Sequence, residues 1–445
     1  MSLRGRLYCF GALTKGLEWQ RYLEEATASV AARTWPDLLE ETIRHAVSNV
    51  PYYASLSLPT TPKLSDFPIL TRRMLRDNLK RLHGLGTKKR TVSRTCTGGS
   101  TGEPIWMIHD RRSRQWDYAA EMYFLGCLLD IPIPIYLSHP RVAIWHTRDQ
   151  RRKWLSITDW VARLLNQVTF IEPYAISSEE TFLSRLAMIN RIRPLVIWGF
   201  ASSLHELARV ARRKNIRLHS PQVIISSVET LYPEMRRAIE EAFGCPVRDC
   251  YGAVEVRRVA AECSQGRLHL LGFNCHVEIL DSEGVPAKPS EEGRLVVTPL
   301  HNRAMPLLRY DIGDMASMAV EPCPCGNPLP VLDGIRGRVI EHFVRTDGSL
   351  VYGGFFVAMF YEHDWISEFQ VLQQDVEDIA VYFKTMPERE VPSQAFAQLE
   401  AAIHDVMGSS CRIEWNEVAA VPRTPLGKHL HTRSLVWEER QRHDP

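Results

Sequence analysis

The sequence has almost no excess of charge of one sign. Its 445 residues include 54 lysines and arginines against 52 aspartates and glutamates, a formal net charge of +2. A protein that is drawn to nucleic acid or to an anionic membrane needs a basic excess or a basic face. No basic stripe with interleaved aromatic residues is present, and the short basic runs are typical of solvated faces. Neither nucleic acid nor a membrane is therefore an expected partner.

Long hydrophobic runs are also missing. The apolar runs, such as Val357–Phe360, are far shorter than the roughly 20 residues that span a bilayer. The first residues lead into no apolar stretch with a small-residue cleavage site, so we expect no signal peptide and a cytoplasmic protein. In that compartment the ten cysteines favour free thiols or metal ligands over a disulfide framework.

What is present indicates an α/β protein of two or three domains. Between residues 177 and 252, helical stripes alternate with short apolar runs, which predicts parallel sheets flanked by helices. After Gly252, short strands separated by turn residues predict a β-rich subdomain. Past Arg338 the pattern starts again as a small α+β unit. We therefore expect a large N-terminal domain over residues 1–337 and a small C-terminal domain over residues 338–445.

The stretch Thr95–Pro104 is rich in glycine and hydroxyl side chains. Glycine lets a backbone approach a ligand closely, and successive N–H groups in a tight turn can bind an anion. Hydroxyl groups add donors for phosphate oxygens. A flexible surface loop has the same composition, and no Gly-Lys-Ser/Thr sequence follows as in a Walker loop. The candidate phosphate-binding residues are Thr97, Gly98, Gly99, Ser100, Thr101 and Gly102.

Further stretches are polar and turn-like in the same way. They are Asp249–Glu255, Arg309–Asp314, Gly337–Arg338 and Pro422–Lys428. With these motifs the chain resembles the adenylate-forming superfamily of acyl-, aryl- and aminoacyl-activating enzymes, and the likeness begins at His45–Tyr53 and Phe67–Arg72. It looks most like the branch of phenylacetate–coenzyme A ligases and related capsule-biosynthesis ligase-like proteins. The likeness covers nearly the whole chain, and several motifs in one order are more specific than any one of them.

The resemblance implies an enzyme that uses ATP. In this superfamily a carboxylate attacks the α-phosphate of ATP to give acyl-AMP and pyrophosphate, so catalysis is mostly positioning and charge neutralisation. By position, the loop 97–102 would hold the β- and γ-phosphates, and Glu103 stands where many relatives carry lysine. Tyr251 would lie against the adenine, with Gly252 allowing the close approach. Glu255 would bind Mg²⁺, for which a carboxylate is a fitting ligand.

Three more roles follow from the resemblance. Asp314 would accept hydrogen bonds from the ribose hydroxyls, and Arg338 would lie beside the ribose or phosphate as a fixed cation. Lys428 would reach the substrate carboxylate and the α-phosphate as a catalytic residue. The C-terminal domain would be mobile, rotating about a hinge just after the Gly-Arg pair, in the segment Arg338–Glu341. Taken alone, these residues would pass for turn residues and a surface lysine.

The acid pocket implied by the resemblance contains aromatic and small residues, which fit an aryl or medium acyl group but are also typical of core packing. Its residues are Trp198, Gly199, Phe200, Ser227 and Glu229. The predicted activity is that of an acid–thiol ligase, with coenzyme A as the expected acceptor. An amine or a carrier-protein thiol fits the same residues. A catalytically weak nucleotide-binding relative is the alternative, against which Lys428, Glu255 and Asp314 argue. The expected partners are small molecules, and a homodimer is left open.

A separate signal comes from Cys263, His269, Cys323 and Cys325. The last two form a Cys-Pro-Cys-Gly turn, which makes a compact thiolate pair, and the first two lie on or beside neighbouring β-type segments. Three sulfurs and one imidazole complete the tetrahedral shell of a closed structural zinc site. Separate packing in the core is the alternative, since free cysteine behaves as a small hydrophobic residue.

Overall fold

The computed structural model describes residues 18–35, 37–87, 92–96, 105–144, 167–171, 179–338, 342–361, 363, 365–386, 389–422 and 430–443. The chain folds into two compact units. The first includes Trp106–Ile312 and Ala316–Ile335, and the second includes Arg336–Pro445. The domain boundary expected at residues 337/338 stays a prediction, and each unit is described by itself below.

A large mixed sheet has the strand order β10-β11-β12-β13-β9-β8-β7-β6-β5-β3-β4. Its strands are β3 (Arg141–Ile144), β4 (Val168–Ile171), β5 (Val196–Gly199), β6 (Val223–Ser227), β7 (Val247–Ala253), β8 (Arg257–Glu262), β9 (Leu268–Leu270), β10 (Cys275–Leu280), β11 (Gly293–Pro299), β12 (Tyr310–Met318) and β13 (Val331–Arg338). The pairs from β4 to β7 are parallel, whereas β8 is antiparallel to both β7 and β9. The predicted α/β fold is thus confirmed. Its parallel and β-rich parts form one continuous sheet, because β7 pairs with β6 on one edge and with β8 on the other.

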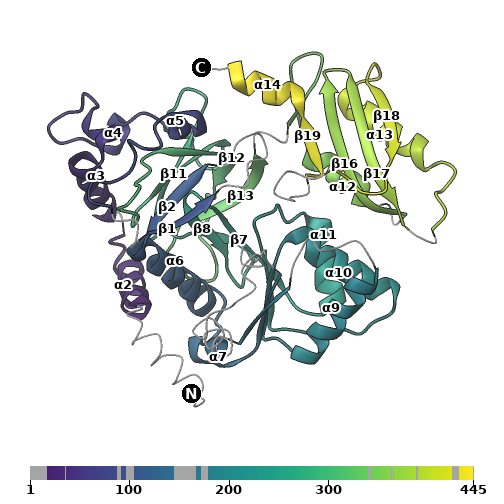
Figure 1. Ribbon diagram of the computed structural model, residues 1–445, viewed down its shortest axis with the longest axis horizontal. Coiled ribbons are helices and arrows are strands. Elements are labelled where there is room, and N and C mark those ends of the chain that lie inside the picture. The colour runs from purple at the N-terminus through teal and green to yellow at the C-terminus, as the bar shows by residue number, and fades with distance from the viewer. Residues whose placement is uncertain are drawn as a thin grey trace. The chain divides into compact units, whose positions relative to one another are not determined.

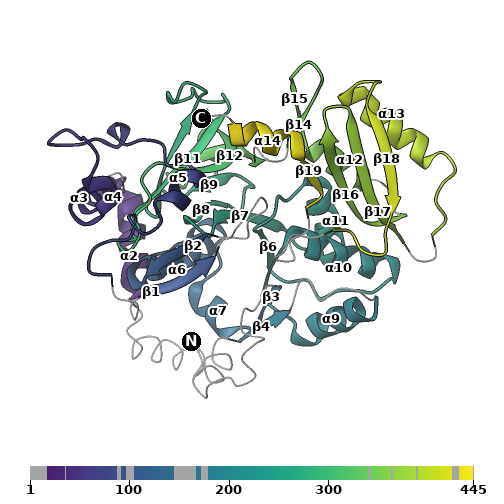
Figure 2. The same cartoon turned by 45° about the horizontal axis from the view of Figure 1, so that its top comes forward.

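Helices pack on the large sheet and on one another. They are α2 (Trp19–Ala32), α6 (Arg111–Tyr123), the π-helical turn η2 (Phe124–Leu128), α7 (Ile133–Ser138), α9 (Glu179–Ile192), α10 (Ala201–Arg213) and α11 (Pro233–Phe243). Among them, α2 packs against α6. Val223 and Ile225 of β6 belong to a buried cluster with residues of α2, α6 and η2. Side chains alternate along a strand, so Ile224 points to the other face of the sheet, where α10 packs. Figures 1 and 2 show α9, α10 and α11 grouped beside these strands.

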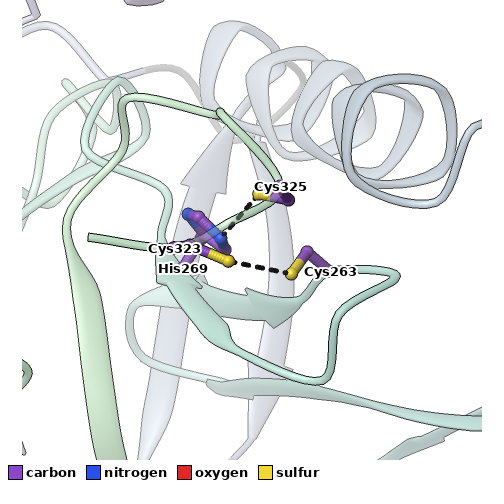
Figure 3. Close-up of side chains that lie close together, drawn as sticks. All are labelled: Cys263, His269, Cys323 and Cys325. Atoms are coloured by element: carbon purple, nitrogen blue, oxygen red, sulfur yellow. Dashed lines mark hydrogen bonds between the residues drawn. The ribbon is translucent and has the colours of Figure 1, made fainter. Parts of the chain in front are cut away.

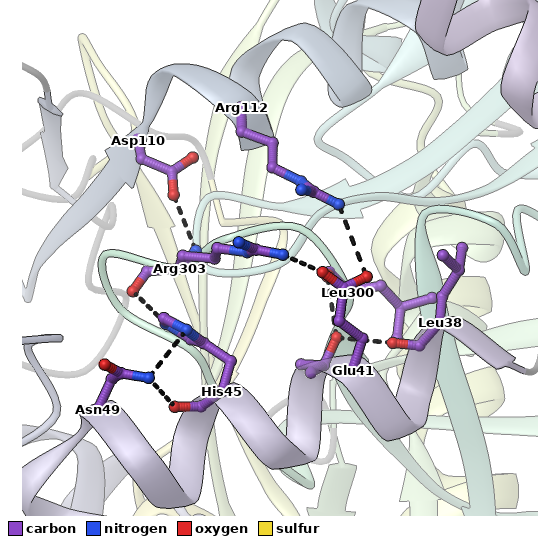
Figure 4. A network of polar contacts seen from close by, with 9 residues as sticks. Leu38, Glu41, His45, Asn49, Asp110, Arg112, Leu300 and Arg303 are labelled. Carbon is purple, nitrogen blue, oxygen red and sulfur yellow. Dashed lines mark hydrogen bonds and ion pairs between the residues drawn. The ribbon is translucent and has the colours of Figure 1, made fainter.

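Hydrogen bonds and an ion pair connect the N-terminal helices to the segment that follows β11. These helices are α3 (Asp37–Asn49), α4 (Pro51–Ala54), η1 (Leu64–Asp66) and α5 (Arg72–Asp77). Thr42 Oγ1 donates to Leu300 O at 2.9 Å, and His45 Nε2 lies 3.0 Å from Arg303 O. Arg303 also forms an ion pair with Glu41 (Figure 4). A hairpin of β1 (Val92–Cys96) and β2 (Trp106–Asp110) leads into α6.

The second unit has a four-stranded sheet of order β18-β17-β16-β19. Its elements are β14 (His342–Val344), β15 (Leu350–Tyr352), α12 (Gly354–Tyr361), β16 (Ile366–Asp375), β17 (Asp378–Thr385), α13 (Ala395–Met407), β18 (Arg412–Glu417), β19 (Thr432–Ser434) and α14 (Leu435–His443). Its core is aromatic, with the ring of Phe383 against Trp365, Phe396 and Trp415. Fully buried Gln373 donates to Val344 O at 2.7 Å, which ties β14 to this sheet. In the described parts of both units, no helix is long and apolar enough to cross a membrane.

Candidate functional site

The ends of three parallel strands bring several predicted residues to one edge of the large sheet. Gly199 at the end of β5 is in register with Ser226 of β6, and Ser227 is in register with Cys250 of β7. The Ser227 hydroxyl donates to Cys250 O at 2.7 Å. Tyr251 is the next residue along β7. In open α/β sheets, ligands bind beyond the carboxyl ends of the strands, so this edge is the candidate binding edge.

The predicted pocket residues do not all have free side chains. The ring of Trp198 packs against Phe124, with centroids 6.1 Å apart, and lies under the Arg258 guanidinium at 5.7 Å. Phe200 is buried as the N-cap residue of α10. Core packing accounts for both positions, and their place in a substrate pocket stays a prediction. Next to Ser227, Val228 is exposed with a φ of 77°, a strained value for a β-branched residue.

Gly252 lies where β7 turns into β8, at an irregularity in the pairing between Tyr251 and Gly252. A Cβ atom at this position would lie 2.3 Å from Arg257 O, so no larger residue fits without moving the backbone. The sequence-based hypothesis assigned this glycine to a close approach of adenine. The structure gives a reason within the protein for glycine at this position, because the tight hairpin that carries Glu255 leaves no room for a Cβ atom.

Glu255 is where three separate motifs meet. Its side chain is 5% exposed, and its Oε1 accepts hydrogen bonds from Arg72 Nη1 at 3.2 Å and from the Tyr310 hydroxyl at 3.3 Å. Arg72 is the first residue of α5, which Thr71 caps by accepting a hydrogen bond from Met74 N. The motifs 67–72, 249–255 and 309–314 thus converge on one carboxylate.

The backbone reinforces this convergence. Leu70 N donates to Arg309 O at 2.8 Å, and Asp311 N donates to Leu70 O at 3.1 Å. The Arg309 guanidinium donates to Phe67 O at 3.0 Å and pairs with Glu278 at 3.1 Å. The segment before α5 is therefore bonded along its length to the start of β12, which fixes where Arg72 lies.

His109 supports the same hairpin from β2. Its Nε2 lies 3.0 Å from Val254 O, so Nε2 carries the hydrogen. Burial, followed by the nearby Arg257 charge, lowers the pKa of His109 to about 3, and the ring is neutral at pH 7. Sequence reasoning assigned no role to His109, Arg72 or Tyr310. Arg72 and Tyr310 lie inside motifs on which the resemblance rests, so their positions in those motifs could have indicated a role. No motif includes His109.

Other predicted residues are placed individually or lie outside the described residues. Asp314 is on β12 and is 7% exposed. Arg338 ends β13, but its side chain is not described. The glycine-rich loop 97–102 and Lys428 lie outside the described part of the chain. The roles of these residues in nucleotide binding and catalysis stay predictions.

The four predicted zinc ligands come together in the first unit (Figure 3). The candidate ligand atoms of Cys263, His269, Cys323 and Cys325 all lie within 4.8 Å of one another. Cys263 and His269 flank the turn between β8 and β9, and the other two lie in the segment between β12 and β13. Residues far apart in sequence thus form one compact group.

Comparison with known proteins gives this geometry a context. Residues 343–434 match the CapK C-terminal domain family. Over 380 residues the chain is 24% identical to Protein CapK of Staphylococcus aureus, covering 83% of this chain and 80% of that protein. Over 177 residues it is 29% identical to a phenylacetate–coenzyme A ligase of Thermus thermophilus, covering 38% of each.

The fold is also that of a solved ligase. A 2-hydroxyisobutyryl-CoA ligase, determined in the postadenylation state in complex with R3-HIB-AMP, superposes with a TM-score of 0.68 at 16% identity, covering 92% of this chain and 91% of that one. The resemblance identified from the motifs is therefore confirmed. The chain is a relative of CapK and of the phenylacetate–coenzyme A ligases, with the fold of an adenylate-forming ligase.

Proposed function

We propose that the protein is an ATP-dependent ligase that activates a carboxylic acid as acyl-AMP and passes the acyl group to coenzyme A. In the first step a carboxylate oxygen bonds to the α-phosphorus of ATP while the α–β anhydride bond breaks and pyrophosphate leaves. In the second step the thiol attacks the acyl carbon and AMP leaves. Both steps bring anions together, so the protein must supply fixed cations and donors.

The observation that carries the proposal is the meeting of three motifs at Glu255. A buried carboxylate is costly unless it is paired, and Arg72 and Tyr310 hold it in one orientation. These contacts use Oε1, and a carboxylate has two oxygens, so Glu255 can keep its partners and still ligate a metal ion. Oxygen ligands of this kind suit Mg²⁺, which would neutralise charge on the phosphates of ATP.

The nucleotide would lie at the edge where β5, β6 and β7 end. Tyr251 and the hairpin after it would be placed against the adenine, with the loop 97–102 on the phosphates. Asp314 would accept hydrogen bonds from the ribose hydroxyls, and Arg338 would lie beside the ribose or the phosphate. Lys428 would offset the repulsion between the acid and the α-phosphate. The relatives that act on phenylacetate support an aryl acid as the first substrate class to test.

The test is ATP–pyrophosphate exchange with a panel of aryl, medium-chain and hydroxylated acids. We expect exchange with a restricted set of acids, strictly dependent on Mg²⁺. The accepted acid is then offered with coenzyme A, with amines and with a carrier-protein thiol, and formation of acyl-CoA is the expected result. Exchange without thioester formation would move the proposal to an amide-forming or carrier-loading enzyme. No exchange with any acid, in a protein that still binds ATP, would favour a nucleotide-binding relative without ligase activity.

A further inference from the structure

The cluster of Cys263, His269, Cys323 and Cys325 lies outside the proposed catalytic machinery, and nothing in the ligase reaction uses it. We propose that these four residues bind one structural zinc ion. They offer three sulfurs and one imidazole nitrogen, the ligand set of a closed Cys₃His site. The side chains of Cys263 and His269 are both 0% exposed, so an ion between them would be shielded from water.

The distances fit a tetrahedral shell. Cys263 Sγ and Cys323 Sγ are 3.6 Å apart, and Cys325 Sγ and His269 Nε2 are 3.3 Å apart (Figure 3). With Zn–S bonds of about 2.3 Å and a Zn–N bond of about 2.0 Å, tetrahedral angles predict S···S edges of roughly 3.8 Å and S···N edges of roughly 3.5 Å. The four side chains therefore need only small shifts to close around an ion.

The surroundings also orient the ligands. His269 Nδ1 lies 3.2 Å from Leu329 O, and donation of its N–H to this carbonyl leaves Nε2 with its lone pair toward the sulfurs. A backbone carbonyl on the second ring nitrogen is the usual support of a metal-binding histidine. The backbone N–H of Asn327 donates to Cys325 Sγ at 3.5 Å, as a donor to a thiolate does. Gly326, with a φ of 77°, makes the turn that presents Cys325.

A disulfide and independent packing of the cysteines both fit the cluster less well. The Sγ–Sγ distance of 3.6 Å is well beyond the roughly 2.05 Å of a disulfide. A disulfide would also leave a third thiol beside the imidazole. Separate buried thiols explain burial, but they do not require three of them to converge on one oriented histidine nitrogen.

The site is placed to stabilise the fold rather than to react. It joins the β8–β9 turn to the segment before β13, and Asn327 Nδ2 extends this link by donating to the Tyr123 hydroxyl of α6 at 2.8 Å. Glu255 precedes β8 and Cys263 follows it, so the six-residue strand separates the two by roughly 20 Å. Zinc binding would thus anchor the far end of the strand that begins at the candidate catalytic hairpin. Because a structural ion contributes folding free energy, its removal should loosen this part of the sheet.

The direct test is metal analysis of the full-length protein, purified without a polyhistidine tag. We expect about one zinc per chain, retained through gel filtration and removed by a strong chelator with a fall in Tm. Cobalt added to the metal-free protein should give the absorption bands of a tetrahedral, sulfur-rich site. A metal-free preparation that is fully stable and takes up neither zinc nor cobalt would overturn the proposal. So would zinc bound with all three cluster thiols still open to alkylation in the folded protein.

Matched variants separate the site from cysteine packing in general. Cys325→Ser changes the most exposed of the three cysteines, and serine is a poor zinc ligand, so we expect loss of the zinc and a lower Tm. Cys275→Ser, at a buried cysteine of β10 outside the cluster, should keep the full zinc content. His269→Cys should retain the ion, because four thiolates also form a closed site. Zinc kept by Cys325→Ser, or lost equally in Cys275→Ser, would contradict the assignment. Neither outcome bears on the ligase proposal.

Discussion

Arg72 and Glu255, 183 residues apart in sequence, form an ion pair with 3.2 Å between Arg72 Nη1 and Glu255 Oε1. The carboxylate side chain is 5% exposed and the guanidinium side chain is 33% exposed. The pair is therefore asymmetric. The buried carboxylate needs its partner to offset the loss of hydration, whereas the guanidinium is still in contact with water. Arg72 is thus a positioning residue for the proposed metal-binding carboxylate.

Replacing Arg72 with Ala should leave a buried carboxylate with Tyr310 as its remaining hydrogen-bond donor among those described above. We expect a loss of about 1 to 2 kcal/mol in the free energy of unfolding, less than the roughly 3 to 5 kcal/mol of a fully buried pair because water reaches Arg72. The apparent affinity for Mg·ATP should fall as well. The checks are urea unfolding and the Mg²⁺ dependence of ATP–pyrophosphate exchange.

The matched control is Arg73→Ala, on the next residue of α5, where an exposed side chain lies 3.9 Å from Asp77. It should change neither the free energy of unfolding nor the Mg²⁺ dependence measurably.

The complementary variant Glu255→Gln keeps the shape of the side chain, removes its charge and leaves Arg72 in contact with water. It should weaken Mg²⁺ use with little loss of stability. An unaltered Mg²⁺ dependence would make Glu255 a structural residue.

The Gly252 hairpin predicts a local and severe effect of one methyl group. In Gly252→Ala the new Cβ would meet the Arg257 carbonyl at 2.3 Å, so β7 and β8 must separate. Overpacking of this kind costs about 1 to 3 kcal/mol. Gly334→Ala on β13 is the control, since no atom lies within 4 Å of the place its methyl group would take. Equal unfolding midpoints for the two variants in a urea titration would contradict this account of the hairpin.

Buried histidines predict that the protein loses stability in mild acid. Burial is the main cause that lowers the pKa values of His109, His205 and His301 to about 3. The unfolded chain takes up these protons near pH 6.5 and the folded protein does not, so this stability is complete above pH 6.5 and falls toward pH 3. Each histidine contributes a slope of up to about 1.4 kcal/mol per pH unit.

One carboxyl group has the opposite effect on stability in acid. Burial, and then the Glu262 charge, raises the pKa of Asp249 to about 7. The folded protein therefore binds this proton at a higher pH than the unfolded chain does, which offsets the loss of stability caused by about one histidine. The check is urea unfolding between pH 7.5 and pH 5 for the wild type and for His109→Gln. The variant should have a smaller slope by about one proton. Parallel curves for the two proteins would show that His109 titrates alike in both states.

Sequence patterns predicted the parts of this fold that depend on local periodicity. The short apolar runs of β5 and β6 and the helix α10 between them follow from residue spacing. The Arg72–Glu255 pair could not be predicted in this way, because a sequence shows which residues can pair but not which distant segments meet. Gly252 was singled out for the approach of adenine, which stays a prediction, whereas the atom that it accommodates in the structure belongs to Arg257 of the same hairpin. The parallel sheet and the β-rich subdomain were expected as separate parts. The local sequence does not indicate that β7 pairs with a strand on each of its edges.

Lys428 provides the sharpest test of the proposed chemistry, because its role rests on the resemblance and lies outside the described residues. Lys428→Ala should reduce acyl-AMP formation by about 100- to 1,000-fold with Tm unchanged, since only charge in the transition state is lost. Lys384→Ala is the control, at a half-buried lysine of β17 in the same unit. ATP–pyrophosphate exchange measures the first step, and thioester formation from supplied acyl-AMP measures the second. Loss of the first with retention of the second assigns Lys428 to adenylation alone. Unchanged exchange in Lys428→Ala would refute the proposed catalytic role of this lysine, whichever acid is the substrate.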